Sequence, residues 1–172
     1  MKRLLAVCIV FLSGVVLAQQ TKSPVSDVAR AMLAGREKNI VAAFEEMPAD
    51  KFGYKPTPDQ MTFGHLVTHI IESNYTFCSK AAAVSAPKVD EAKESDGKDK
   101  LLASLKSSFD FCSDTLSKMD DSKLGESTDF FGGRQVSRAF VALVLASRWS
   151  DHYGAEAMYL RLNGLSPPSA KK

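Results

Sequence analysis

The sequence predicts an all-α protein, a four-helix bundle, and three observations lead to this fold class. Four segments of about 20 residues repeat apolar residues at intervals of three and four, the spacing of one helix face. No segment alternates convincingly between apolar and polar residues, as a half-buried strand does. The chain has 172 residues, of which 45% are hydrophobic and 24% charged. This composition fits one globular domain and excludes a collagen-like chain, a disordered acidic tail and a small disulfide-stapled scaffold.

The N-terminal segment has the layout of a secretory signal peptide. Lys2 and Arg3 precede an apolar run over residues 4–18, which ends in small or modest residues. A membrane anchor is the alternative, but the run is shorter than the roughly 20 residues that span a bilayer. We therefore expect cleavage after Ala18, export to the periplasm or the medium, and no stable membrane anchor afterwards.

The predicted domain organisation follows from this cleavage. Residues 1–18 are the signal peptide, 19–25 a polar leader, 26–168 the helical bundle and 169–172 a disordered tail. Cleavage removes two basic residues from a chain with a formal charge of +2, so the mature protein is formally neutral. A neutral chain has no basic field that recruits nucleic acid, and we expect no nucleic-acid partner.

Each predicted helix has its own start or stop signal. The first spans 26–47, where a Ser-Asp pair caps its start and Pro48 follows its end. The second spans 62–83, opens on a threonine and carries one wide apolar stripe. The third spans 98–119. The fourth spans 137–163 and is apolar almost all round near its start, so we expect it to be the central, most buried helix.

Irregular segments connect these helices. Residues 85–100 mix Lys, Asp and Glu with a proline and a glycine, which is typical of a solvated loop. The connection 120–134 ends in Gly132-Gly133, which we interpret as a turn rather than an anion-binding loop. We interpret its two aromatic residues, Phe130 and Phe131, as packing residues rather than a ligand cage.

Two cysteines remain after cleavage, Cys78 on the second helix and Cys112 on the third. Both lie on the inner faces of their helices, and an oxidising compartment favours one disulfide between them. Such a bridge closes a loop of about 35 residues and contributes about 3–4 kcal/mol in the chain-entropy model. The alternative is that both are small buried apolar residues.

The three histidines are the only residues that point to particular chemistry. His65 and His69 lie one turn apart on the second helix, and a helical wheel places both off its apolar stripe. His152 lies on the fourth helix, with Arg148 one turn before it and Glu156 one turn after. Such a histidine coordinates metal, acts as an acid or base, or joins a polar ladder along the helix.

Several motifs in order resemble the DinB-like superfamily of metal-binding four-helix bundles. Met61–Ile70 (MTFGHLVTHI) is similar to the opening of that family's second helix, and Phe52–Pro58 to the link before it. Asp151–Gly154, and then Tyr159–Gly164 with Pro167-Pro168, are similar to its last helix and exit. The resemblance implies an up-down-down-up bundle with a long crossover between the second and third helices.

The resemblance also implies a metal site of one histidine from the second helix and two from the last. His69 and His152 match two of these positions, but the third is Arg148, which has no free lone pair. His65 or Glu156 would complete a shell for a divalent metal (Zn, Ni or Mn). In that case the resemblance implies a metal-dependent hydrolase or transferase. Some relatives are thiol-dependent S-transferases or isomerases, but an exported protein meets little reduced thiol.

Three hypotheses therefore stay open at this point. The first is an exported metal-binding protein that acts on an unidentified small molecule. In the second, Arg148 supplies a fixed positive charge and the cleft binds a small anion without catalysis. In the third, the pocket is vestigial and the protein has a structural or interaction role, as a homodimer formed through an exposed helical face.

Overall fold

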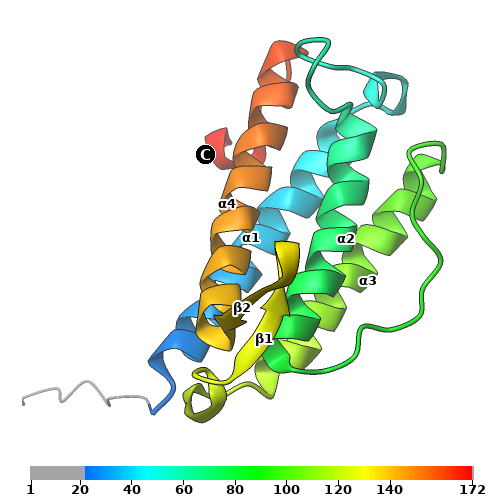
Figure 1. Ribbon diagram of the computed structural model, residues 1–172. Helices are drawn as coiled ribbons and strands as arrows, with labels where there is room; N and C mark the ends of the chain where they lie inside the picture. The colour runs from blue at the N-terminus through cyan, green and yellow to red at the C-terminus, as the bar shows by residue number, and fades with distance from the viewer. Residues whose placement is uncertain (1–21, 172) are drawn as a thin grey trace, which may run out of the picture.

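The computed structural model describes residues 22–171, and four long helices account for most of them. They are α1 (Pro24–Glu46), α2 (Phe63–Ala82), α3 (Lys98–Ser117) and α4 (Arg138–Leu162). These helices pack side by side in one bundle, in which α2 lies against both α3 and α4, and α1 lies against α4 and α3 (Figure 1). The predicted all-α class and the four helices are confirmed, each within two residues of its predicted bounds.

Short elements complete the described chain. Four 3-10 turns lie at Ala49–Lys51, Asp121–Lys123, Phe131–Gly133 and Pro168–Ala170. Residues 83–97 leave the end of α2 and return along the bundle to the start of α3 (Figure 1). No helix within residues 22–171 is long and apolar enough to cross a membrane. The predicted signal peptide and the first residues of the leader lie outside the described part.

A β-hairpin is the main departure from the predicted fold. Strand β1 (Ser127–Phe130) pairs antiparallel with β2 (Arg134–Ser137), where we predicted no strand. Four residues are too few for a period of two to be recognised. The turn between the strands contains Gly132 and Gly133 at φ of 69° and 71°, a left-handed conformation that favours glycine. The interpretation of this pair as a turn is confirmed.

The start of α1 is held by a distant carboxylate rather than by its own Ser-Asp pair. The helix begins at Pro24, two residues before the predicted cap. Asp121 accepts hydrogen bonds from the backbone N–H groups of Val25 and Ser26, both at 2.9 Å, and from the Ser26 hydroxyl at 2.7 Å. Free N–H groups at a helix start need such acceptors. The predicted cap was wrong because Ser26 lies inside the helix, where its hydroxyl donates to Asp121.

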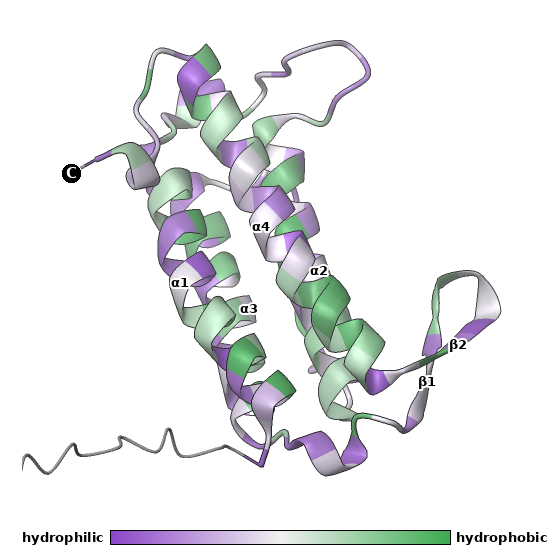
Figure 2. Cartoon of the chain, turned by 90° about the vertical axis from the view of Figure 1, so that its left-hand side faces the viewer, coloured by the Kyte–Doolittle hydropathy of each residue, from purple (hydrophilic) through white to green (hydrophobic). Residues whose placement is uncertain are grey.

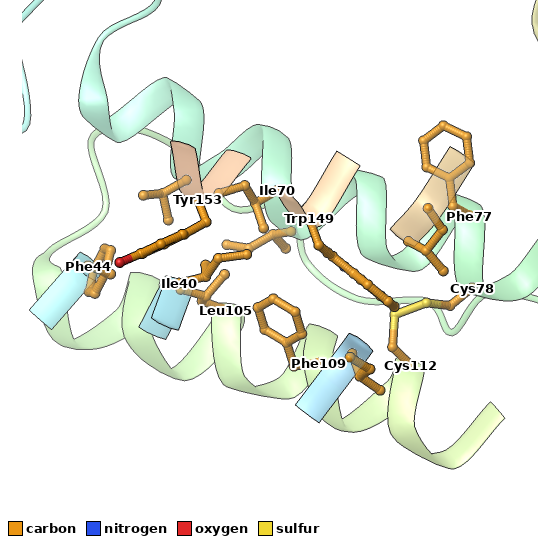
Figure 3. Close-up of a cluster of buried hydrophobic side chains, with 14 of the residues drawn as sticks. Ile40, Phe44, Ile70, Phe77, Cys78, Leu105, Phe109, Cys112, Trp149 and Tyr153 are labelled. Carbon is orange, nitrogen blue, oxygen red and sulfur yellow. A yellow bond between two sulfur atoms is a disulfide. The ribbon is translucent and has the colours of Figure 1, made fainter. Parts of the chain in front are cut away.

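A continuous apolar core fills the bundle (Figure 3). Its largest fully buried side chains come from all four helices and include Phe44, Phe63, Phe109 and Trp149. Trp149 donates its indole N–H to the Asn74 side-chain oxygen at 2.9 Å, which satisfies the only polar atom of the ring. The core therefore fixes α4 against α2 near the middle of both helices.

The expectation that α4 is the central, most buried helix is wrong, because α2 buries 12 of its 20 residues and α4 buries 12 of its 25. Leu143 is 61% exposed and Phe140 is 39% exposed, although both lie in its most apolar stretch. Four packed helices share the core, and each keeps an outer face. The Phe140 ring instead packs edge-on against Phe130 of the hairpin, with centroids 5.3 Å apart. Figure 2 shows apolar residues gathered where the start of α4 and the end of α2 meet near this hairpin.

Residues 169–171, which we expected to form part of a disordered tail, make defined contacts. The backbone N–H of Ser169 donates to the Tyr153 hydroxyl at 2.8 Å, and Lys171 pairs with Glu46 at the end of α1. The C-terminal segment therefore continues onto the surface formed by α1 and α4.

Candidate functional site: a histidine pair beside an arginine

Two histidines from different helices meet where α2 packs against α4. The rings of His69 and His152 lie edge to face, with centroids 5.3 Å apart and planes at 83°. His152 is buried at 7% exposure, and its Nδ1 atom has no hydrogen-bond partner among the described residues. His69 is only half-buried. The expected convergence of these two rings is confirmed. The His152 ring is buried, whereas the His69 ring is partly accessible to solvent.

Arg148 lies one turn before His152, at the position that the family pattern gives to a third ligand. Its guanidinium lies over the Phe77 ring, 5.2 Å from the centroid, and its buried Nε atom has no hydrogen-bond partner in the described structure. Arg148 and His69 line a cavity of about 160 Å³. The remaining lining residues of this arginine cavity are Glu72, Ser73, Thr76, Phe77 and Phe131.

Burial and the arginine charge keep both imidazoles neutral. Burial, together with smaller electrostatic effects of His69 and Arg148, lowers the pKa of His152 to about 4. Burial also lowers the pKa of His69, with Arg148 acting in the same direction and Glu72 opposing it. At neutral pH the pair therefore offers one N–H donor and one lone pair on each ring beside a fixed cation.

His65 contacts Glu94 and not the histidine pair. Its Nδ1 atom lies 2.8 Å from Glu94 Oε1, on the connection between α2 and α3, and half of its side chain is exposed. Glu94 also accepts a hydrogen bond from the Thr62 hydroxyl, and this bond is the main cause of its lowered pKa. The contact fastens the end of the connection to the start of α2.

Glu156 lies in the core. It has no exposed surface, and neither of its carboxyl oxygens has a hydrogen-bond partner in the described part of the chain. Burial raises its pKa well above the ordinary value, which favours the neutral acid form of the group. A neutral acid is a poor metal ligand.

These residues do not fit a three-ligand metal centre. Within residues 22–171 no group of three His, Cys, Asp or Glu side chains lies close enough to hold a metal ion. The expectation that His65 or Glu156 completes the shell is therefore wrong. His65 pairs with Glu94 and Glu156 is buried in the core, while a fixed cation occupies the third position.

A larger cavity adjoins the arginine cavity. It has a volume of about 440 Å³ and lies between α2 and residues 86–92 of the connection. The two cavities share three lining residues, His69, Glu72 and Thr76. Glu72 was not singled out from the sequence, although its position three residues after His69 places both on one face of α2. Phe131, which we interpreted as a packing residue, packs against Phe77 and also lines the arginine cavity, and no local pattern shows that the hairpin reaches α2.

Solved structures of several proteins share this fold. A DinB-like protein from Bacillus subtilis is 19% identical, with a TM-score of 0.66, and the match covers 81% of this chain and 93% of that one. A DinB-like protein from Bacillus cereus is 16% identical, with a TM-score of 0.68 and coverage of 83% and 95%. A mutant of a mycothiol-dependent maleylpyruvate isomerase is 10% identical, with a TM-score of 0.62 and coverage of 75% and 59%. Likenesses at these identities show a shared fold.

The sequence itself also matches a family. No curated protein matches it. The family model described as the DinB superfamily matches residues 32–154, a range that runs from within α1 into α4 and includes the histidine pair and Arg148. The chain therefore belongs to the DinB superfamily.

Proposed function

We propose that this protein binds a small anion, a carboxylate or a phosphate, beside its histidine pair. The observation that carries the proposal is that Arg148 and His69 line one cavity, while His152 contacts the His69 ring. A guanidinium binds carboxylate and phosphate through parallel N–H donors. The hydroxyls of Ser73 and Thr76 line the same cavity and add further donors.

The electrostatics favour an anion over a cation at this point. Arg148 lowers the pKa of both histidines, which means that it repels a second positive charge at either ring. A divalent cation at the pair meets the same repulsion, whereas an anion is attracted and can also accept a hydrogen bond from a neutral imidazole N–H. In a cavity of about 160 Å³ the ligand group is small.

Thermal unfolding with added acetate or inorganic phosphate, at constant ionic strength with chloride as baseline, tests this proposal. Ligand at about 100 times its Kd stabilises the folded state by about 2.7 kcal/mol, which for a chain of this size raises Tm by roughly 5–10 °C. Arg148→Met removes the charge at similar length and is expected to abolish the shift. Arg161→Met, an exposed arginine of the same helix, is the matched control and keeps it. Equal shifts in the wild type and Arg148→Met would contradict the proposal.

Divalent metal binding is the second candidate, and the contact between the two neutral rings favours it. Neutral imidazoles offer the free lone pairs that Zn, Ni or Mn need. We expect the wild type, purified without added metal, to hold less than one metal ion per chain by elemental analysis. Arg148→His supplies a third imidazole four residues before His152 and is expected to raise the metal content toward one. Stoichiometric metal in the wild type that is lost in His152→Ala would favour this candidate instead.

We further propose that the protein acts in an oxidising compartment outside the cytoplasm. The disulfide between Cys78 and Cys112 supports this location, because such bonds persist mainly in exported proteins.

We also propose that the four helices run up-down-down-up. The long return of residues 83–97 between α2 and α3 supports this order of directions (Figure 1). The exposed apolar side chains of α4, Leu143, Met158 and Leu162, support a homodimer as a further proposal.

A further inference from the structure

We propose that the natural ligand is a zwitterion, with an anionic group beside Arg148 and an amine in the adjoining cavity. This inference rests on the proposed function and names its ligand class. It starts from the two cavities, which meet at His69, Glu72 and Thr76. Their volumes of about 440 Å³ and 160 Å³ together fall in the range of small-molecule sites.

Each cavity has charged groups of its own beyond the junction. Arg148 lines only the smaller cavity, Asp90 and Glu91 line only the larger one, and Glu72 at the junction lines both. The lining of the larger cavity within the described residues contains no lysine or arginine. Its two histidines do not offset these carboxylates: His69 is neutral, and His65 already faces Glu94. A ligand that lies across the junction therefore meets a positive wall at one end and a negative wall at the other.

Apolar side chains line the larger cavity between its charged groups. Ile71 and Tyr75 come from α2, and Pro87, Val89 and Ala92 come from the connection. Val89 is 52% exposed, so its apolar surface is available to a ligand. Methylene groups between the two charges of a zwitterion would cover this surface.

The wall formed by the connection is fastened at its far end. Glu94 accepts hydrogen bonds from the Thr62 hydroxyl and the His65 ring at the start of α2. At the other end Ala83 closes α2 in a left-handed conformation with φ of 55°. Asp90 and Glu91 are therefore carried by a segment held at both ends alongside α2, which favours a defined site over a loose loop.

Calorimetric titration with probes matched in length tests the inference. Hexanoate carries only the anion, hexylamine only the amine, and 6-aminohexanoate both. We expect 6-aminohexanoate to bind about tenfold more tightly than either single-charge probe, because it gains a second ionic contact. A parallel titration with 4-aminobutyrate reports how far apart the two charges must be. Since the acidic wall is partly exposed, the advantage should shrink as salt is added.

The variants separate this inference from the proposed function. Asp90→Asn with Glu91→Gln is expected to reduce 6-aminohexanoate to the affinity of hexanoate and to leave hexanoate unchanged. Asp50→Asn with Asp59→Asn, two exposed acids outside both cavities, is the matched control. Arg148→Met should weaken both carboxylates.

Each other outcome has a single meaning. If hexanoate binds as tightly as 6-aminohexanoate, the zwitterion inference is overturned while anion binding stands. If hexylamine binds as tightly as 6-aminohexanoate, the carboxylate adds nothing to binding, the site binds cations, and both the inference and the proposed function are overturned. If no carboxylate binds, the proposed function itself fails.

Discussion

At the scale of single residues, the chemistry of the site depends on one substitution within a family pattern. Arg148, at the position that the resemblance gives to a ligand, is always protonated, and its charge adds to burial in lowering the pKa of both neighbouring imidazoles. The same helix carries a buried carboxyl group, Glu156, one turn beyond the buried His152. The pKa of Glu156 is raised and the pKa of His152 is lowered, so their effects on stability change with pH in opposite directions and can be separated.

The signs follow from the shifts in pKa. The pKa of Glu156 is raised in the folded state, so its contribution to stability is complete below about pH 4.5 and is lost as pH rises through the folded pKa. The pKa of His152 is lowered to about 4, so the folded state gains stability as pH rises from about 4 to 6.5. As pH rises above about 4.5 the two slopes oppose each other, and above about pH 6.5 His152 no longer contributes a slope.

We therefore predict that Glu156→Met changes the pH profile as well as the stability. The variant removes an unpaired buried carboxyl group at similar volume, so it should be more stable than the wild type at pH 8 by about 1–3 kcal/mol. Its free energy of unfolding should rise by up to about 3 kcal/mol from pH 4 to 6.5 and then stay level. Urea unfolding followed by the fluorescence of Trp149, the only tryptophan, measures both. A wild-type curve that runs parallel to that of the variant at every pH would show that Glu156 does not titrate as argued.

At the scale of elements, the helices could be predicted and the hairpin could not. In each helix apolar residues recur every three or four positions over about 20 residues, so the pattern does not depend on any single residue. The predicted bounds of α2 and α4 therefore lie within one residue of the observed ones. The hairpin has four residues in each strand, and it is stabilised by aromatic packing of Phe130 on Phe77 and Phe140, contacts with distant parts of the chain. The start of α1 was missed for the same reason, because its cap comes from Asp121.

This long-range cap gives a prediction about α1. Asp121→Ala leaves the first N–H groups of the helix without their acceptor and is expected to cost about 1–2 kcal/mol of stability. Hydrogen exchange at Val25 and Ser26 should accelerate more than exchange in the middle of α1. Asp120→Ala is the control, because in residues 22–171 that neighbouring carboxylate accepts hydrogen bonds from Ser122 within its own turn and from no residue of α1. Equal losses in the two variants would mean that the contact to α1 adds nothing.

At the scale of the whole molecule, part of the site was readable from the sequence and part depended on packing. His69, His152 and Arg148 could be named because each matches a position in a family pattern. Their mutual approach depends on how α2 packs against α4, which Trp149 and Asn74 fix in the core. The acidic wall could not be predicted, since Asp90 and Glu91 lie in a segment without periodicity that becomes part of the site only by folding back along α2.

The disulfide links this folded-back segment to the stability of the bundle. Cys78 of α2 and Cys112 of α3 are joined across a sequence separation of 34, and the loop that they close contains residues 83–97. The predicted bridge is confirmed, and it constrains the unfolded chain by about 3–4 kcal/mol. Because the same loop carries one wall of the larger cavity, the bridge also limits how far that wall can move from α2.

Reduction is therefore predicted to lower stability and ligand affinity together. Urea unfolding should show a loss of about 3–4 kcal/mol on adding a reductant, and 6-aminohexanoate should bind more weakly to the reduced protein. The double variant Cys78→Ala, Cys112→Ala should match the reduced wild type and should not respond to the reductant, which separates loss of the bond from other effects of reduction. Intact mass after alkylation without reduction should show no alkyl group on either cysteine. Two alkyl groups, or reduced protein as stable as oxidised protein, would mean that the bridge does not hold α2 and α3 together in solution.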